Sequence, residues 1–337
     1  MKILFSGHHN PHFITITEYL EKAIQSLGHE LVIFEDRQHK IPGRIRKLSP
    51  FLNQLDLKII NKKILSIAEV TKPDIAIVTG GHRISRETVN KLKERGVVSI
   101  LWTIDAPLNF QPLIDIAPIY DYIFCQGTEA IELFTGTGII DAQWLPMACD
   151  PEYHYPVYCS VADKEKFGSD IVFVGSYYPE RADLFERISM FDFAIWGPGW
   201  DSLDRHSPLR RCIRGAHTTP DKWLTIYSAS KIIISTHYHD RQNRFPVYQA
   251  SPRVFEILSC GAFQLCDDQR DVFSLFKDGE DLVKFVDTND LIKKINYYLA
   301  HPEERKEIAA KGRQNVIENH TYVHRIKKLL SYVCCET

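Results

Sequence analysis

The segment SPRVFEILSCGAFQLCDD, residues 251–268, places one carboxylate, Glu256, among apolar residues and closes with two aspartates. Pro252 favours the first turn of a helix, and Gly261 favours the position just after a helix end. The segment therefore predicts a short buried helix that leads into a buried strand. Glu256 lies in the middle of that helix. A carboxylate in such surroundings is costly unless a partner satisfies it.

Two kinds of partner fit Glu256. Arg253 lies three residues earlier, and a local ion pair at this spacing contributes only about 0.2–0.5 kcal/mol. Alternatively, the two carboxylate oxygens match the two hydroxyls of a vicinal diol, with the helix N-terminus at Ser251–Arg253 facing a phosphate. The spacing alone leaves both interpretations open.

A second segment with binding potential is GSYYPER, residues 175–181, which follows the strand-like run DIVFV. Gly175 and Ser176 allow backbone N–H groups to approach an anion at a helix N-terminus, and Arg181 can add a charge-assisted hydrogen bond. The alternative is an ordinary strand–helix turn in which Arg181 pairs with Glu180 or is solvated. The chain lacks G-x-G-x-x-G and P-loop motifs at its strand–helix turns, which disfavours hydride transfer and P-loop chemistry.

Four residues in the first half end expected strands and are candidates for a base that takes a proton: His8, His9, His82 and Asp105. Asp105 also fits an ordinary turn or helix cap. In the second half, His237 and His239 alternate before Asp240. We expect one of these histidines to line a polar site and the other to be exposed, and we favour this over a metal site.

Composition limits the class of protein. The 337 residues carry a formal net charge of −2, which gives no global attraction to nucleic acid or anionic membranes. No apolar run approaches the roughly 20 residues that span a bilayer. The eight cysteines show neither zinc spacing nor a disulfide framework, so we expect a cytoplasmic protein with reduced thiols. One local charge run stands out, and it is either a solvated face or a surface for an anionic acceptor or membrane: Arg205, Arg210, Arg211 and Arg214.

Apolar strands alternate with helical stretches along most of the chain. Six strands are expected between residues 2 and 146, an irregular linker follows at 149–169, and five strands and three final helices come after it. Such alternation predicts parallel sheets covered on both faces. We therefore expect an α/β protein with two doubly wound Rossmann-like domains facing across a cleft. Ligands in such domains bind beyond the carboxyl ends of the strands.

The whole pattern resembles the CgeB-like, or spore-maturation-protein-like, glycosyltransferases of GT-B type. The resemblance rests on SPRVFEILSCGAFQLCDD, DIVFVGSYYPER, WGPGW, YSASKIIIST, WLPMACDP and the last helices, and it is densest from 170 to 330. It implies that Glu256 holds the donor ribose and that Arg181 holds the diphosphate. Many retaining relatives carry a second glutamate where this chain has Tyr248. The resemblance therefore does not imply that this chain retains the configuration of the transferred sugar.

The resemblance also implies a domain map and a site. An acceptor-side domain would comprise residues 1–155 with a helix at about 320–337 packing back on it, and a donor domain would comprise 168–318. The donor is expected to be a nucleotide-sugar, commonly a UDP-sugar, without a metal or another cofactor. The acceptor stays open between a polysaccharide, a peptide and a small metabolite, with no stable nucleic-acid binding. The implied donor residues are Gly175, Ser176, Tyr177, Arg181, Trp196, Gly197, His237, Ser251, Pro252, Arg253 and Glu256.

Two other functions fit the same scaffold. A sugar-nucleotide epimerase would need several acid and base groups around the sugar, and the chain has enough histidines and acids to allow it. A non-catalytic nucleotide-binding or assembly protein would need only the binding residues. Incubation with UDP-sugars in the absence of an acceptor separates these functions from glycosyl transfer.

Overall fold

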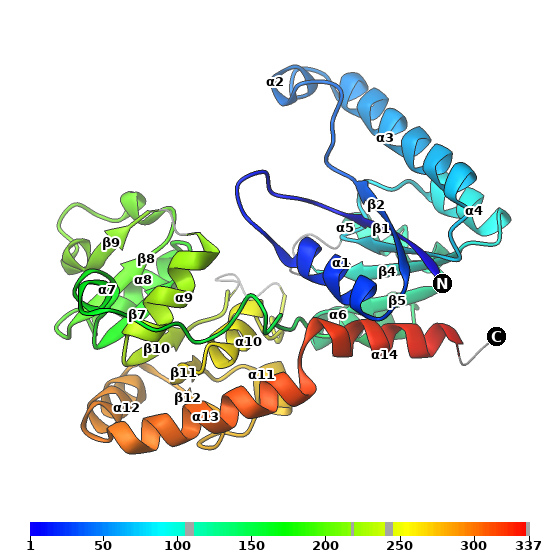
Figure 1. Ribbon diagram of the computed structural model, residues 1–337. Helices are drawn as coiled ribbons and strands as arrows, with labels where there is room; N and C mark the ends of the chain where they lie inside the picture. The colour runs from blue at the N-terminus through cyan, green and yellow to red at the C-terminus, as the bar shows by residue number, and fades with distance from the viewer. Residues whose placement is uncertain (105–110, 217–218, 240–244, 335–337) are drawn as a thin grey trace. The chain divides into compact units, whose positions relative to one another are not determined.

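The computed structural model describes residues 1–104, 111–216, 219–239 and 245–334 of the chain, which divides into two compact units. The first unit comprises Met1–Pro146 and Arg325–Thr337, and the second comprises Met147–His324. Each unit is built around one parallel sheet (Figure 1).

The sheet of the first unit has the strand order β2-β1-β3-β4-β5-β6, and all its pairs are parallel. All five residues of β3 are buried, as expected where helices cover both faces. Chain order reverses between β1 and β3, which makes this pair the topological switch point of the sheet. The six strands expected before residue 146 are confirmed: β1 (Lys2–Gly7), β2 (Glu30–Glu35), β3 (Ile75–Thr79), β4 (Val98–Thr103), β5 (Tyr122–Cys125) and β6 (Ala142–Trp144).

Helices connect these strands, and capping residues define where several of them begin. Thr15 and Glu18 form a capping box at the start of α1, so two backbone N–H groups of the first turn have partners. Ser85 caps α4 in the simpler way, by accepting from the N–H of Thr88. The helices are α1 (Ile16–Ser26), α2 (Gly43–Arg46), α3 (Pro50–Thr71), α4 (Arg86–Glu94), α5 (Gln111–Ile114), the 3₁₀ helix η2 (Ala117–Ile119) and α6 (Thr128–Gly136).

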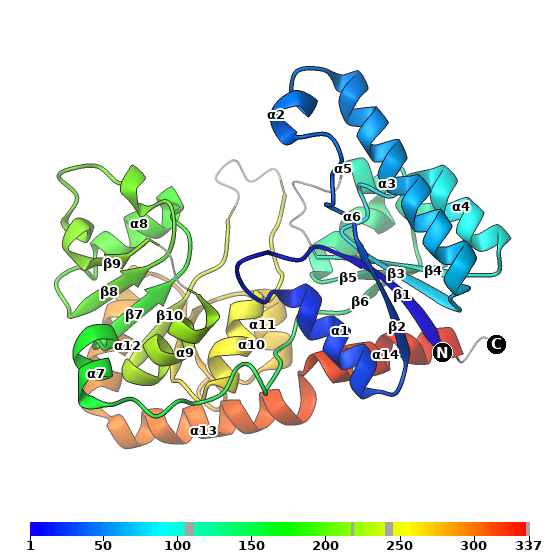
Figure 2. The ribbon, with the colours of Figure 1, turned by 45° about the horizontal axis from the view of Figure 1, so that its top comes forward.

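The last helix, α14 (Tyr322–Cys334), joins the first unit from Arg325 onward. Ile326 and Leu329 are fully buried. Arg325 Nε donates to the carbonyl of Pro146 at 2.8 Å, and the rings of Tyr332 and Phe124 meet edge to face at 5.6 Å. Figure 2 shows α14 beside the strands of this unit.

The sheet of the second unit has the order β12-β11-β10-β7-β8-β9, again parallel, with its switch point between β7 and β10. The five expected strands are present, but β9 was not predicted. It is a three-residue edge strand that directly follows an arginine-rich 3₁₀ helix. The charged residues around it leave no apolar run from which a strand could be predicted. The strands are β7 (Ile171–Val174), β8 (Phe193–Trp196), β9 (Ile213–Gly215), β10 (Ile232–Ser235), β11 (Gln264–Asp267) and β12 (Val283–Phe285).

The helices of the second unit agree with the sequence except in the expected linker. Residues Val161–Phe167 form helix α7, because Ser160 and Asp163 make a capping box that sequence periodicity does not reveal. The predicted short helix at 252–260 is confirmed as α10, which ends before Gly261 at φ +65°. The other elements are α8 (Pro179–Glu186), η3 (Trp200–Ser202), η4 (Pro208–Cys212), α9 (Pro220–Ala229), α10 (Pro252–Ser259), α11 (Arg270–Leu275), α12 (Thr288–Ala300) and α13 (Pro302–Asn319).

Within the described ranges, the chain has no helix that is both long and apolar enough to cross a membrane. The described cysteines, Cys125, Cys149, Cys159, Cys212, Cys260 and Cys266, are all free thiols, and all are buried.

Candidate functional site

The switch point of the second unit brings together the segments that follow β7 and β10. Arg181, on the first turn of α8, spans these two segments. Its Nη1 donates to the carbonyl of Ser176 at 2.8 Å, its Nε donates to Thr236 Oγ1 at 3.0 Å, and its Nη2 donates to the Thr236 carbonyl at 2.9 Å. The side chain is therefore a fixed part of the loop structure at this edge of the sheet.

Arg181 lies close to a second arginine, Arg253. Burial, reinforced by the nearby charge of Arg253, lowers the pKa of Arg181 to about 10. The guanidinium also lies over the rings of Phe173 and Tyr178, at 5.1 and 4.7 Å from their centroids. Among the described residues, no carboxylate lies within ion-pair distance of either guanidinium group, and two such neighbouring groups form a charge arrangement that an anion neutralises.

Two glycines allow the loops after β7 and β8 to touch. Gly197 has φ +142°, and a Cβ on it would lie 2.2 Å from the carbonyl oxygen of Gly175, so no other residue fits there. Gly175 donates from its N–H to the carbonyl of Trp196 at 2.7 Å. Trp200 Nε1 donates to the carbonyl of Gly175 at 2.9 Å, so the WGPGW turn holds the GSYY turn in position.

Arg253 lies directly beside Gly175. A Cβ added to Gly175 would be 2.6 Å from Arg253 Nη1. Arg253 is half-buried. In the described structure its guanidinium does not come within ion-pair distance of the Glu256 carboxylate. The local Arg253–Glu256 pair, one of the two interpretations of the spacing, is therefore not formed.

Glu256 is the buried carboxylate of helix α10. The residue is 7% exposed. Its charged contact is with His154, whose Nε2 lies 3.9 Å from Glu256 Oε1, beyond hydrogen-bonding distance. In the part of the chain that the structure describes, no side chain or backbone N–H donates to this carboxylate. Among the described residues, no protein group therefore satisfies the Glu256 carboxylate with a hydrogen bond.

His237 is fully engaged by neighbouring protein groups. Its Nδ1 lies 2.6 Å from Asp267 Oδ1, and its Nε2 accepts from the N–H of Ser251 at 3.0 Å. His239 Nε2 lies 3.3 Å from the other oxygen of Asp267. These contacts hold the pKa of Asp267 well below its usual range despite its burial. His237, Cys266 and Asp267 cluster closely enough to hold an ion, but both ring nitrogens of His237 already have partners. Asp240 lies outside the described residues.

The remaining donor residues from the sequence divide into two groups. Ser251 caps α10 by accepting from the N–H of Arg253, and Pro252 occupies the first turn, so both shape the helix N-terminus. Tyr177 packs edge to face on Trp200 at 5.4 Å, and Trp196 is 8% exposed within a hydrophobic cluster. The contacts of these two aromatic side chains in the structure are with neighbouring aromatic and apolar groups, and their assignment to the donor stays a prediction.

The first unit has its own cavity at the β1/β3 switch point. The cavity has a volume of about 210 Å³ and is lined by the ends of β1, β2 and β3. The residues around it are His8, Thr15, Ile16, Thr17, Asp36, Arg37, Thr79, Gly80, His82, Arg83 and Ile104. Hydroxyl, imidazole, carboxyl and guanidinium groups therefore converge at the place where such sheets bind ligands.

Asp36 is the residue of this cavity that sequence reasoning missed. It is 5% exposed, and its Oδ1 has no hydrogen-bond partner in the described part of the chain. Burial raises its pKa to about 6, against the opposing charges of Arg83 and Arg37. The available signal was its position two residues beyond the run ELVIF, equivalent to the other strand ends that we considered.

The predicted bases of the first unit differ in their surroundings. His8 and His82 line the cavity, and His8 Nδ1 is 3.2 Å from Glu35. His9 does not line it, because its ring joins Glu35 at 2.9 Å and Glu21 at 2.8 Å. Burial alone would lower the pKa of His9, but these carboxylates raise it, so His9 is poorly suited to accept a proton. Asp105 lies outside the described residues.

The arginine run at 205–214 is largely tied to its own unit. Arg210 donates to the carbonyls of Asp204 and Leu203, and Arg211 donates to the carbonyl of Ser189. Arg214 lies 3.9 Å from Asp192. These contacts favour the interpretation of a structured, solvated face over that of a surface reserved for an anionic ligand.

Comparisons with known proteins agree with this geometry. Residues 181–331 match the family described as "Glycosyl transferase-like". Spore protein CgeB of Bacillus subtilis (strain 168) is 22% identical over 266 residues, which cover 75% of this chain and 81% of that protein. Glu256, Arg253 and Arg181 all fall inside the matched family region.

Solved structures share the fold over nearly the whole chain. Sucrose-phosphate synthase (tll1590) from Thermosynechococcus elongatus aligns over 100% of both chains with a TM-score of 0.72 and 12% identity. Anabaena Alr3699/HepE in complex with UDP and glucose covers 99% of this chain and 100% of its own, with a TM-score of 0.65 and 11% identity. The predicted pair of doubly wound domains is confirmed as a GT-B fold, and the chain resembles spore protein CgeB and, over residues 181–331, the glycosyl transferase-like family.

Proposed function

We propose that this protein transfers a sugar from a nucleoside-diphosphate donor, of the UDP-sugar type, to a hydroxyl group of an acceptor. The observation that carries the proposal is the arrangement around Gly175. The Arg253 guanidinium lies beside this glycine, and the buried Glu256 carboxylate follows one helical turn later without a hydrogen-bond donor among the described residues. The solved relative HepE was crystallised with UDP and glucose.

Each part of this arrangement matches one part of such a donor. Arg253 and the N-terminus of α10 would hold the diphosphate, whose negative charge grows as it leaves. The two oxygens of Glu256 would accept hydrogen bonds from the ribose hydroxyls. Arg181 would add to the positive potential while it fixes the Ser176 and Thr236 loops. Positive charge for the leaving group would then come from the protein, without a metal or another cofactor.

On the acceptor side, we propose that the cavity of the first unit binds the hydroxylated group. If the transfer inverts configuration, Asp36 would take the acceptor proton, since a carboxyl group with a pKa of about 6 is ionised near neutral pH yet basic enough to accept a proton. His8 and His82 line the same cavity, and Asp105 stays a candidate from the sequence. The reaction is proposed to take place in the cytoplasm, where nucleotide-sugars and free thiols are both stable.

The donor assignment is tested by replacing Glu256 with alanine. Hydrogen bonds to a charged group contribute about 1.5–3 kcal/mol each, so nucleotide affinity should fall by about one to three decades. The wild-type protein should prefer UDP over 2′-deoxy-UDP in calorimetry, and the variant should lose most of that preference. Glu303→Ala on α13, an exposed glutamate paired with Lys306, is the matched control. An unchanged ribo/deoxy ratio in Glu256→Ala would remove Glu256 from the ribose site.

The reaction type is tested separately. The protein is incubated with UDP-sugars in the absence of an acceptor, and the products are separated by chromatography. Slow release of UDP supports transfer to water in place of the acceptor. A changed sugar that is still attached to UDP supports an epimerase, and binding without turnover supports a non-catalytic nucleotide-binding protein.

A further inference from the structure

The outer face of α3 in the first unit is unusual for a helix of a globular protein. Leu48, just before the helix, and Phe51 and Leu55 within it are 82, 69 and 41% exposed. Lys58 and Lys62 continue the series and are exposed as well. The spacing of three and four residues places Phe51, Leu55, Lys58 and Lys62 on one side of α3, and Leu48 lies exposed just before the helix begins. We call these five residues the α3 stripe.

The α3 stripe points away from the hydrophobic core. The buried residues of α3 are Asp56, Ile60, Asn61, Ile64 and Ala68, which lie on the opposite side of the helix. A surface helix normally presents polar residues to solvent opposite its buried face. Here the first two turns present Phe51 and Leu55 to solvent, opposite the buried face. Contiguous exposed apolar groups of this kind mark interaction sites.

The surroundings of the α3 stripe are strongly basic. Residues 37–63 contain eight lysines and arginines but one acidic residue, Asp56, whereas the whole chain has a net charge of −2. Asp56 is fully buried and is held by His39 Nδ1 and by the backbone N–H groups of Lys40 and Ile41. Its charge therefore does not reach the surface. These bonds also anchor the preceding basic loop and α2 against α3.

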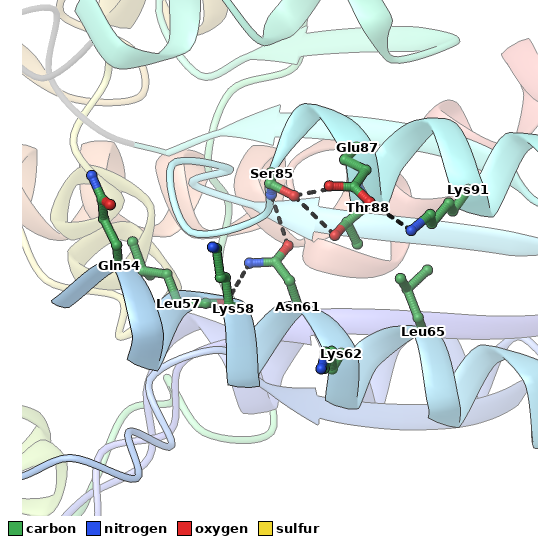
Figure 3. A pocket seen from close by; sticks show the side chains of 10 residues that line it. All are labelled: Gln54, Leu57, Lys58, Asn61, Lys62, Leu65, Ser85, Glu87, Thr88 and Lys91. Atoms are coloured by element: carbon green, nitrogen blue, oxygen red, sulfur yellow. Dashed lines mark hydrogen bonds and ion pairs between the residues drawn. The ribbon is translucent and has the colours of Figure 1, made fainter. Parts of the chain in front are cut away.

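A groove between α3 and α4 extends the basic surface. It has a volume of about 360 Å³, and Lys58 and Lys62 line it from α3 together with Lys91 from α4 (Figure 3). Lys91 is paired with Glu87 at 2.6 Å, so Lys58 and Lys62 contribute most of the positive charge here. The groove adjoins the α3 stripe because the same two lysines belong to both.

We propose that the α3 stripe and the basic segment 37–63 dock the protein on a bilayer surface that contains anionic phospholipids. Stable peripheral binding combines apolar side chains that enter the interface with lysines and arginines that attract acidic headgroups. Both parts occur together in this stripe. Nucleic acid or an acidic protein would explain the basic charge but not Leu48, the most exposed of the three apolar side chains. Docking of this kind is independent of the donor assignment.

The test uses the full-length protein and phosphatidylcholine vesicles with and without phosphatidylglycerol, in a flotation assay. The wild type should bind the anionic vesicles at about 0.1 M salt and much less at about 0.5 M, since salt shortens the range of the attraction. Each lysine near an anionic surface contributes about fivefold, so Lys58→Glu with Lys62→Glu should weaken binding by more than about 20-fold. Leu48→Ser with Phe51→Ser should weaken it by roughly tenfold.

Two control variants carry equivalent changes on the second unit. Tyr158 and Val161 are 95 and 75% exposed, and replacing both by serine should leave vesicle binding unchanged. Replacing Lys306 and Lys311 by glutamate on α13 matches the charge change. Thermal unfolding, measured on every variant, shows whether the fold is intact. The proposal is overturned if the wild type does not bind anionic vesicles, or if the controls weaken binding as much as the stripe variants. Vesicle binding that needs the two lysines but not Leu48 and Phe51 would also overturn it.

Discussion

His154 Nε2 lies 3.9 Å from Oε1 of Glu256, and both residues are more than nine-tenths buried. The N–H of Asp150 donates to His154 Nδ1 at 3.1 Å, which leaves the proton of the neutral ring on Nε2, toward the carboxylate. Burial lowers the pKa of His154 against the nearby charges of Glu256 and Asp150, so the neutral ring is favoured. An irregular segment of the chain thus brings a ring N–H toward the carboxylate that we assign to the ribose.

His154 is therefore expected to act as a positioning residue for Glu256. His154→Phe should weaken UDP binding by roughly three- to tenfold and should reduce the preference for UDP over 2′-deoxy-UDP. His154→Gln, which keeps an N–H group near the position of Nε2, should retain most of that preference. Calorimetry with both nucleotides measures the two effects. If the phenylalanine variant lost stability but kept the ribo/deoxy ratio, His154 would have only a packing role.

The two arginines near Gly175 should separate into a structural and a binding residue. Arg181 makes three hydrogen bonds to Ser176 and Thr236, which the single ammonium group of lysine cannot reproduce. Arg181→Lys should therefore lower the free energy of unfolding by about 2–4 kcal/mol. Arg253→Gln should leave stability within about 0.5 kcal/mol but weaken UDP binding by roughly 10- to 100-fold, with little effect on uridine. Thermal unfolding and calorimetry distinguish these results, and equal losses for UDP and uridine would exclude Arg253 from the diphosphate site.

Asp36 should make the first unit less stable as pH rises. Its pKa is raised from 3.8 to about 6 in the folded protein, so the folded state binds the proton more tightly than the unfolded chain does. The stability from this proton is complete below about pH 4 and is lost as pH rises through about 6. Asp36→Asn should therefore be more stable than the wild type by up to about 2–3 kcal/mol at pH 7 and similar to it at pH 4. Urea denaturation at both pH values measures the difference, with the exposed Asp201→Asn as control.

The same substitution tests catalysis. If Asp36 takes the acceptor proton, wild-type turnover should rise with pH through about 6, and Asp36→Asn should lower it by roughly 10²–10⁴-fold with little change in UDP affinity. Full activity of the variant would exclude Asp36 as the base. His8, His82 and Asp105 would then remain as candidate bases, or the transfer would retain configuration and need no base.

The terminal helix should be required for the stability of the first unit. Leu329 is fully buried, and replacement of such a leucine by alanine costs about 2–5 kcal/mol. Lys327→Ala, an exposed position on the same helix, should change stability by less than about 0.5 kcal/mol. A deletion from Thr321 should be more severe than Leu329→Ala. Calorimetric unfolding checks the series, and a truncated protein with unchanged melting would contradict the packing of α14.

The sequence by itself determined the strands, most helices and the class of fold. The reason is that apolar runs, helix caps and the alternation of strands with helices are local features, and they fix which residues enter a parallel sheet. It also singled out Glu256, because one carboxylate in an apolar helix is visible without any tertiary information. Local patterns failed at β9, which lies in a charge run, and at α7, a short helix in a segment without apolar periodicity.

Only the tertiary structure decided which side chains meet. It showed that Arg181 is bonded to Ser176 and Thr236 while Arg253 lies beside Gly175, and that His154 approaches Glu256. It also showed Asp36 to be buried in a cavity, whereas both nitrogens of His9 are held by carboxylates. These contacts join strand ends far apart in the chain. Their distances depend on the order of the strands in each sheet, and side-chain burial sets the pKa of each group, so neither could be obtained from residue types and spacing.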